Sequence, residues 1–147
     1  MSNMLLLLIW LPASVVFGFQ YVVQLRLLYS LQQQCSAIVD NAAELGATDI
    51  DWQSFLSNTP ALSIPQSQAD VATTLAAGFA TVTALAGPGY SGLSVWVGNP
   101  GQTDPFTGQV AALPTVHVKG TVRVDALGNG NQTTLHIDQG AVADSTR

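Results

Sequence analysis

The sequence predicts an α+β fold, in which a long N-terminal hydrophobic helix packs on a small domain with a second helix and an antiparallel sheet of three or four strands. Three observations predict it. The chain opens with an apolar segment, Met4–Val23, and apolar residues then recur every three or four positions over residues 25–45. Towards the C-terminus, valines alternate with polar residues up to a glycine-rich turn. We place the long helix at residues 1–47 and a globular domain at residues 48–147.

The composition excludes some partners. Charged residues make up 9% of the chain, against about 25% in a typical soluble domain. The net charge is -5, with only four Lys and Arg residues. Because nucleic-acid binding needs clustered cations, we expect no nucleic-acid partner. Cys35 is the only cysteine, which excludes an intrachain disulfide, and we interpret it as a packing residue in the helix.

The opening apolar segment is long enough to cross a bilayer, since its 20 residues span about 30 Å as a helix. A cleaved secretory signal fits poorly, because no Lys or Arg precedes the segment and no small-x-small cleavage site follows it. A permanent anchor lacks the flanking cations that orient such helices. Earlier removal of a short basic leader upstream of Met1 would explain both features. Pro12 predicts either an ordinary membrane-helix kink or a point where a packed helix can bend.

The second half of the long helix carries an apolar stripe. Its members are Leu25, Leu28, Leu31, Cys35, Ile38, Ala42 and Leu45. Gly46 follows as a suitable C-terminal stop. We therefore expect one helix from Met4 to Leu45, about 60 Å long, apolar on all sides in its first half and on one side in its second. The one-sided half is expected to pack against the chain's own domain.

The domain is expected to begin with a turn-rich segment over residues 48–64. The apolar residues expected to contact the core from this segment are Trp52, Phe55 and Leu56. A second helix is predicted to start at Pro65, with Ser67 and Asp70 in the spacing of a capping box. Its apolar face is Val71, Leu75, Phe79, Val82 and Ala86. The stretch Gly87–Gly89 then ends it.

The sheet is expected to begin with a strand at Leu93–Val97, followed by a loop rich in Pro and Gly at Asn99–Gln109. Residues 115–125 alternate regularly. The apolar face of this strand is Val116, Val118, Val122 and Val124, and the polar face is His117, Lys119, Thr121 and Arg123. A glycine-rich turn at residues 127–132 leads to a partner strand at residues 133–138.

No catalytic centre is predicted. His117 and His136 lie in the two arms of the hairpin, where they could meet with Asp125 or Asp138 nearby. Their spacing matches no metal signature, so we interpret both as solvated residues on the face of the sheet. Nucleophile-elbow, phosphate-loop and zinc-protease motifs are all lacking from the sequence. We expect no enzyme activity, no cofactor and no metal site.

The N-terminal third of the chain, residues 11–47, resembles the N-terminal segment of TadE-like pseudopilins and, more broadly, of type IV pilin-like proteins. The residues that carry the resemblance are Pro12, Phe17, Gly18, Tyr29, Gln32, Ala42, Ala43, Gly46 and Ala47. One departure is Leu5, because pilin-like proteins usually have glutamate at the fifth mature position. The resemblance implies removal of a leader by a prepilin peptidase and polymerisation from the membrane.

The function expected from this resemblance is that of a structural subunit of an extracellular type IV pilus-like filament. The residues expected to form the assembly helix are Leu5, Leu8, Pro12, Val16, Phe17, Gly18, Val22, Leu25, Leu28 and Leu31. The expected partners are copies of the chain itself, the inner membrane before assembly, and a surface or cell adhesion target. The alternative is a membrane-anchored, monomeric extracytoplasmic module for binding or for pilus assembly, of the minor pseudopilin kind. The long helix continues without a flexible linker, which favours the filament.

Overall fold

The computed structural model describes residues 2–57, 59–87, 89–126, 128 and 130–143, and of residues 2–9, 11 and 13 it describes the backbone alone. The elements are α1 (Ser2–Gly46), α2 (Trp52–Leu56), α3 (Ile64–Phe79), β1 (Gly92–Gly98), β2 (Thr115–Val124) and β3 (Thr133–Val142). The three strands form one antiparallel sheet in the order β1-β2-β3. The α+β class, the long helix and the antiparallel sheet are confirmed, with three strands in the part of the chain that is described.

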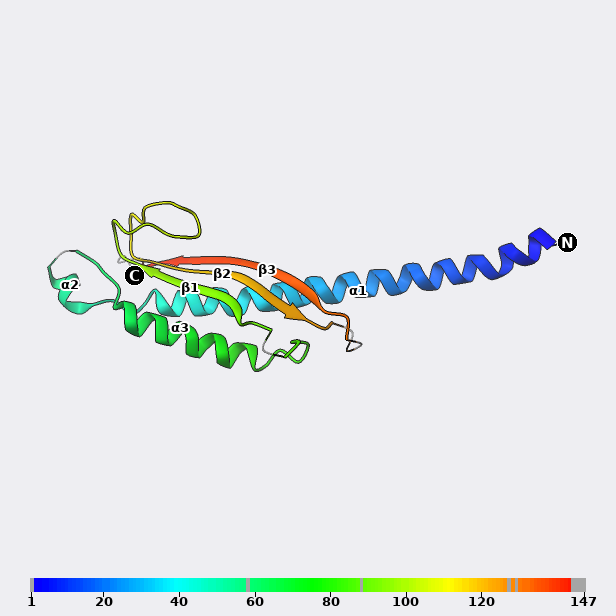
Figure 1. Cartoon of the computed structure of the whole chain (residues 1–147), viewed down its shortest axis with the longest axis horizontal. Helices are drawn as coiled ribbons and strands as arrows, with labels where there is room; N and C mark the ends of the chain where they lie inside the picture. Colours follow the sequence, from blue (N-terminus) through cyan, green and yellow to red (C-terminus); the bar gives the residue numbers. More distant parts are fainter. Residues whose placement is uncertain (1, 58, 88, 127, 129, 144–147) are drawn as a thin grey trace.

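The helix α1 is the longest element and sets the shape of the molecule. Its 45 residues run without interruption through Pro12 and span about 68 Å. Figure 1 shows its N-terminal half projecting beyond the domain, while its C-terminal half lies along the sheet. The expected end of the helix at Gly46 is confirmed.

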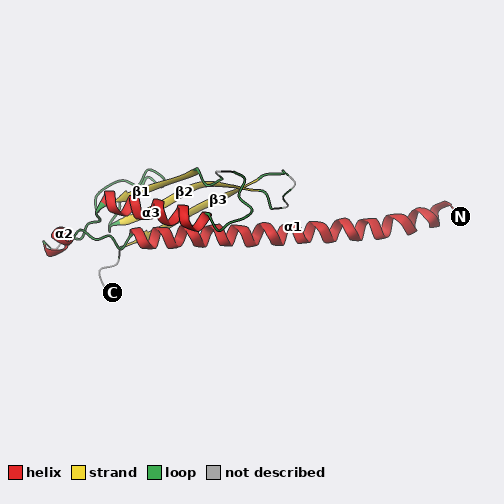
Figure 2. Cartoon of the chain, turned by 90° about the horizontal axis from the view of Figure 1, so that it is seen from below, coloured by secondary structure: helices red, strands yellow, loops and turns green. Residues whose placement is uncertain are grey.

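Both long helices pack on one face of the sheet, α1 beneath β3 and β2 and α3 beneath β1 (Figure 2). The valines at alternate positions of β2 face the helices as expected. All four are fully buried: Val116, Val118, Val122 and Val124. From α1 the core receives Cys35, Val39, Ala42 and Ala43, and from α3 it receives Val71, Leu75 and Phe79. The packing role expected of Cys35 agrees with this burial. One consequence is that the globular core includes the C-terminal turns of α1.

The apolar stripe of α1 is narrower than its spacing predicted. Cys35 and Ala42 are buried and Ile38 is half-buried, but Leu25 and Leu45 are 48% and 46% exposed. Leu25 lies before the helix reaches the domain. Leu45 points away because residues 39, 42, 43 and 46 occupy the buried side at the end of the helix.

The contact between α1 and α3 depends on a close approach at Gly46. The buried Ser67 Oγ donates a hydrogen bond of 2.8 Å to the Gly46 carbonyl oxygen. The predicted capping box was therefore wrong: Ser63 is the N-cap of α3, Pro65 stands in its first turn, and Ser67 bonds to the neighbouring helix instead. The helix begins before Pro65 because this residue suits an early helical position, where its missing N–H costs nothing.

The helix α3 ends at Phe79, although the apolar periodicity predicted its continuation to Ala86. Residues 80–86 form turns, in which Val82 remains buried. The backbone at residues 84–86 bonds to the end of β2 and the residue after it, since Ala86 N donates to Arg123 O at 3.1 Å and Asp125 N donates to Ala84 O at 2.7 Å. Pairing with the end of the sheet has replaced the last helical turns.

The segment α2 does not contribute to the core, so this expectation was wrong. Trp52, Phe55 and Leu56 are 71%, 42% and 84% exposed. The Asp51 side chain caps the short helix by accepting hydrogen bonds from Gln53 N and Ser54 Oγ. This helix lies at the end of the molecule opposite the projecting half of α1, beyond the sheet (Figure 1), where no core is available to its side chains.

We predict that Gly46→Ala destabilises the fold by about 1–3 kcal/mol, because a Cβ there would overlap Cγ2 of Val71 and lie 3.0 Å from Ser67 Oγ. Gly18→Ala is the matched control, since a Cβ at this position of the same helix meets no atom within 4 Å. Urea unfolding of the full chain in mild detergent, followed by circular dichroism, measures both. Equal stability of the two variants would contradict the close approach.

Candidate functional site

The projecting half of α1 presents a continuous apolar surface. Its large exposed side chains are Trp10, Val15, Val16, Phe17, Phe19, Tyr21, Val22, Val23, Leu25 and Leu27. Because each residue is rotated by about 100° around the helix axis from the one before it, these side chains point to all sides of the helix. A helix that is apolar on all sides is normally buried in a protein or in lipid.

The residues expected to form the assembly helix divide into three groups. Pro12, Val16, Phe17, Gly18, Val22 and Leu25 are exposed on the projecting half. Leu28 and Leu31 are half-buried against the core of the chain's own domain. Leu5 and Leu8 belong to α1, but their side chains lie outside the described residues. The structure therefore divides the expected assembly residues into exposed ones on the projecting half and two, Leu28 and Leu31, that already pack against the chain's own domain.

The border between the two segments is near Gln32. Its Nε2 donates a hydrogen bond of 2.9 Å to the carbonyl oxygen of His136 on β3. From here to Gly46, one side of α1 is covered by the sheet and by α3. The projecting half is thus held rigidly by the packed half of the same helix.

The expected membrane-spanning segment, Met4–Val23, includes residues 4–9, 11 and 13, whose side chains lie outside the described residues. Among the described residues, no helix reaches the combination of length and hydropathy that a bilayer crossing requires.

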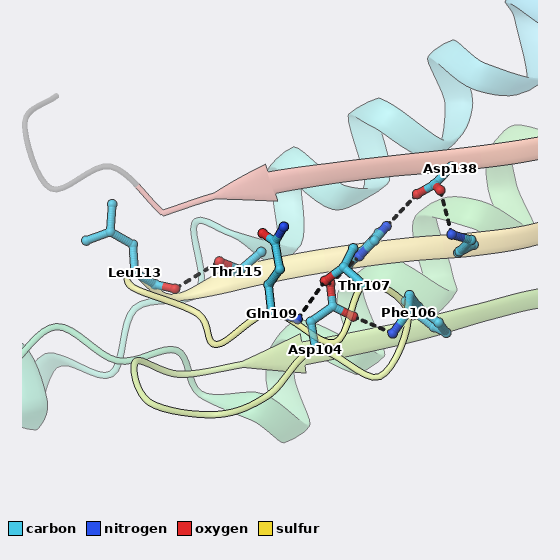
Figure 3. A network of polar contacts seen from close by, with 9 residues as sticks. Asp104, Phe106, Thr107, Gln109, Leu113, Thr115 and Asp138 are labelled. Atoms are coloured by element: carbon cyan, nitrogen blue, oxygen red, sulfur yellow. Dashed lines mark hydrogen bonds and ion pairs between the residues drawn. The ribbon is translucent and has the colours of Figure 1, made fainter.

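A second feature lies in the domain, on the face of the sheet opposite the helices. His117 of β2 is 7% exposed and lies between two carboxylates. Its Nδ1 is 2.6 Å from Asp104 Oδ2, and its Nε2 is 2.6 Å from Asp138 Oδ1 (Figure 3). When both carboxylates are ionised they only accept hydrogen bonds, so both ring nitrogens then donate and the ring is an imidazolium. Such charge-assisted bonds are about twice as strong as neutral ones.

The three residues of this cluster, His117, Asp104 and Asp138, come from three different segments of the chain. Asp138 lies on β3, opposite Lys119 of β2, whose Nζ is 2.8 Å from Asp138 Oδ2. Asp104 comes from the loop between β1 and β2, where it also accepts hydrogen bonds from Phe106 N and Thr107 Oγ1. The cluster therefore fastens this loop to β2 and β3.

The charges of the cluster explain its pKa shifts. Burial alone would lower the pKa of His117, but the hydrogen bonds and charges of Asp138 and Asp104 outweigh it and raise the pKa. Burial would raise the pKa of Asp104, but hydrogen bonds from His117, Phe106 N and Thr107 lower it. The hydrogen bonds from Lys119 and then His117 lower the pKa of Asp138.

The interpretation of both histidines as solvated was correct for His136 and wrong for His117. His136 is exposed on β3 opposite Thr121, while His117 is opposite Gly140, so the two rings do not meet. No sequence signal shows that the loop turns back to bring Asp104 to the strand. Proximity of Asp138 and Lys119 follows once the hairpin register is known.

Both nitrogens of His117 are occupied by carboxylates, and no group of three or more His, Cys, Asp or Glu in the described part of the chain is arranged to hold a metal ion. Cys35 is buried on the other side of the sheet, where burial raises the pKa of its thiol. The cluster acts as an ionic fastening of the loop.

Neither a protein-family model nor a curated protein nor a solved structure matches the chain. What the molecule does is therefore inferred from its own residues.

We predict that His117→Gln destabilises the fold by about 3 kcal/mol, because it leaves the buried Asp104 without its cation. The matched control is His136→Gln, an exposed site where the change should stay within about 0.5 kcal/mol. Urea unfolding at pH 6 measures both variants. A cluster that contributes nothing would give two indistinguishable curves.

The stability of the wild-type chain should also depend on pH. The raised pKa of His117 stabilises the fold fully below its unfolded value of about 6.5, and this contribution falls as the pH rises through the folded value. The lowered pKa values of Asp104 and Asp138 stabilise it fully above about 4, and their contribution falls as the pH drops through the folded values. The cluster's contribution is therefore greatest between about pH 4 and 6.5. His117→Gln should flatten the decline above pH 6.5, as unfolding curves across this range would measure.

Proposed function

We propose that the chain is a structural subunit of an extracellular type IV pilus-like filament and that it polymerises through α1. The observation that carries the proposal is the projecting half of this helix, which is apolar on all sides and has no cover from the described residues of its own domain. The likeness of residues 11–47 to pilin-like N-termini supports the same function.

The energetics favour a partner for this half. Ten large apolar side chains are exposed between Trp10 and Leu27. Each stabilises by about 1.5–3 kcal/mol when it is fully buried, so their burial among neighbouring helices is a large driving force. Residues 4–9 extend the same apolar run by sequence. A bundle of identical helices would cover all sides at once.

Before assembly, we place the apolar half in the inner membrane and the domain on its extracytoplasmic side. A subunit held there would pass from lipid into the bundle without exposing the helix to water. The polar outer surface of the domain, including the loop at residues 99–109, would then lie on the outside of the filament. In that position it could contact neighbours or an adhesion target.

The alternative is a membrane-anchored monomer that binds a ligand or assists pilus assembly. A tethered module more often has a flexible linker between anchor and domain. Here the helix enters the core directly, with Cys35, Val39, Ala42 and Ala43 fully buried. This rigid connection gives the domain a fixed orientation relative to the helix, which a regular filament requires and a tether does not.

We predict that Phe17→Asp abolishes filaments, because a carboxylate would be buried in the helix bundle without a partner. Leu56→Asp is the matched control: this side chain is equally bare but lies on α2, at the opposite end of the molecule. Electron microscopy of material sheared from producing cells, with mass spectrometry of its main band, measures assembly. Normal filaments of Phe17→Asp would refute packing through this half.

A further inference from the structure

Arg26 is an isolated charge on the assembly surface. No other residue from 1 to 39 carries a charged side chain. Arg26 is exposed on α1 between the exposed Leu25 and Leu27, and it makes no ion pair with any residue that the structure describes. If copies of the chain cover this part of the helix, the guanidinium loses water and needs an acidic partner.

The next charges along α1 are Asp40 and Glu44, and both are exposed. At 3.6 residues per turn, Glu44 follows Arg26 by five whole turns and lies on the same side of the helix, and Asp40 is within about 40° of that side. The buried Val39 and Ala43 belong to the other side, which faces the domain. All three charges are therefore exposed on one side of the helix, and Asp40 and Glu44 lie beside the end of β3.

These charges cannot pair within one chain. Arg26 is separated from Asp40 by about 21 Å and from Glu44 by about 27 Å along a continuous helix. The two carboxylates are four residues apart on one helix, where like charges repel each other. They also form the α1 side of a hollow whose other side is the end of β3, Gly140–Val142. Among the described residues, Arg26 thus has no anionic partner at one level of the helix, and Asp40 and Glu44 have no cationic partner at another.

We propose that Arg26 of one copy pairs with the Asp40 and Glu44 carboxylates of a neighbouring copy, which lies parallel and is shifted by 14 to 18 residues. The inference rests on the proposed filament and adds the contact that sets the lengthwise shift between subunits. Its shift corresponds to about 21–27 Å. Copies related by such a shift meet through different surfaces, as an open helical assembly requires.

The same shift also suits the apolar surfaces. With a shift of 18 residues, residues 2–10 of one copy lie level with residues 20–28 of the next, so a segment that is mostly apolar by sequence meets one with exposed apolar side chains. The charge pair lies beyond this overlap, where residues 11–26 of one copy lie level with residues 29–44, in the packed half of the next. A lone charge in an apolar contact commonly fixes register in helix assemblies.

The test is a charge exchange in the full chain, measured as the amount of filament sheared from producing cells. Arg26→Glu and Glu44→Arg alone should each lower the yield at least tenfold. The double variant R26E/E44R should restore most of it, and this rescue reports contact between copies because the two sites are too far apart to pair within one chain. Arg123→Glu, on the exposed polar face of β2, makes the same change of net charge away from the helix and should assemble normally.

A cross-link provides the second measurement. Arg26→Cys combined with Glu44→Cys in a Cys35→Ala background should give disulfide-linked dimers and longer ladders under mild oxidation of filaments. Either new cysteine alone should give far less. Monomers alone from the double-cysteine filaments would overturn the pairing.

The outcomes separate the two proposals. Wild-type filaments together with normal assembly of Arg26→Glu, or with no rescue by the exchange, would overturn the charge pair and leave the filament standing. In that case, weaker binding of Arg26→Glu to phosphatidylglycerol vesicles would assign Arg26 to lipid headgroups. A wild-type chain found only in membranes, with no filament, would overturn both.

Discussion

The structure depends on the continuity of α1. One unbroken helix supplies both the apolar segment that projects and the turns that complete the domain core (Figure 1). Since Cys35, Val39, Ala42 and Ala43 are fully buried there, the domain is not folded independently of the helix.

The sheet is stabilised differently on its two faces. Towards the helices, the valines of β2 form a purely apolar layer against α1 and α3. On the opposite face, the ion pairs of His117 with Asp104 and Asp138 hold the loop between β1 and β2 against the sheet. The apolar layer is insensitive to pH, and the charged fastening is not, because it depends on opposite ionisation of His117 and its two partners. The domain thus combines a permanent core with a loop attachment that has a preferred pH range.

Charged residues are scarce in this chain, so each one is a distinctive feature of the surface. With 9% charged residues, the chain has few charges that would lose water if copies packed together as the proposed function requires. Under the proposed function, Arg26 and the Asp40–Glu44 pair are the exceptions on α1. Their separation along the helix would then set the lengthwise shift between neighbouring copies. Lys119, by contrast, already pairs with Asp138 of its own domain.

The sequence alone determined the elements whose signal is local. The long helix and its end at Gly46, the β2 valine face and the β2–β3 hairpin all follow from periodicity and turn residues, because each pattern is repeated over many neighbouring positions. Tertiary structure decided what depends on distant partners. The end of α3 at Phe79 depends on hydrogen bonds from residues 84–86 to β2, and the exposure of Trp52 depends on the position of α2 beyond the sheet. The contact of His117 with Asp104 needs a loop residue 13 positions away to fold back onto the strand, and no local spacing encodes such a contact.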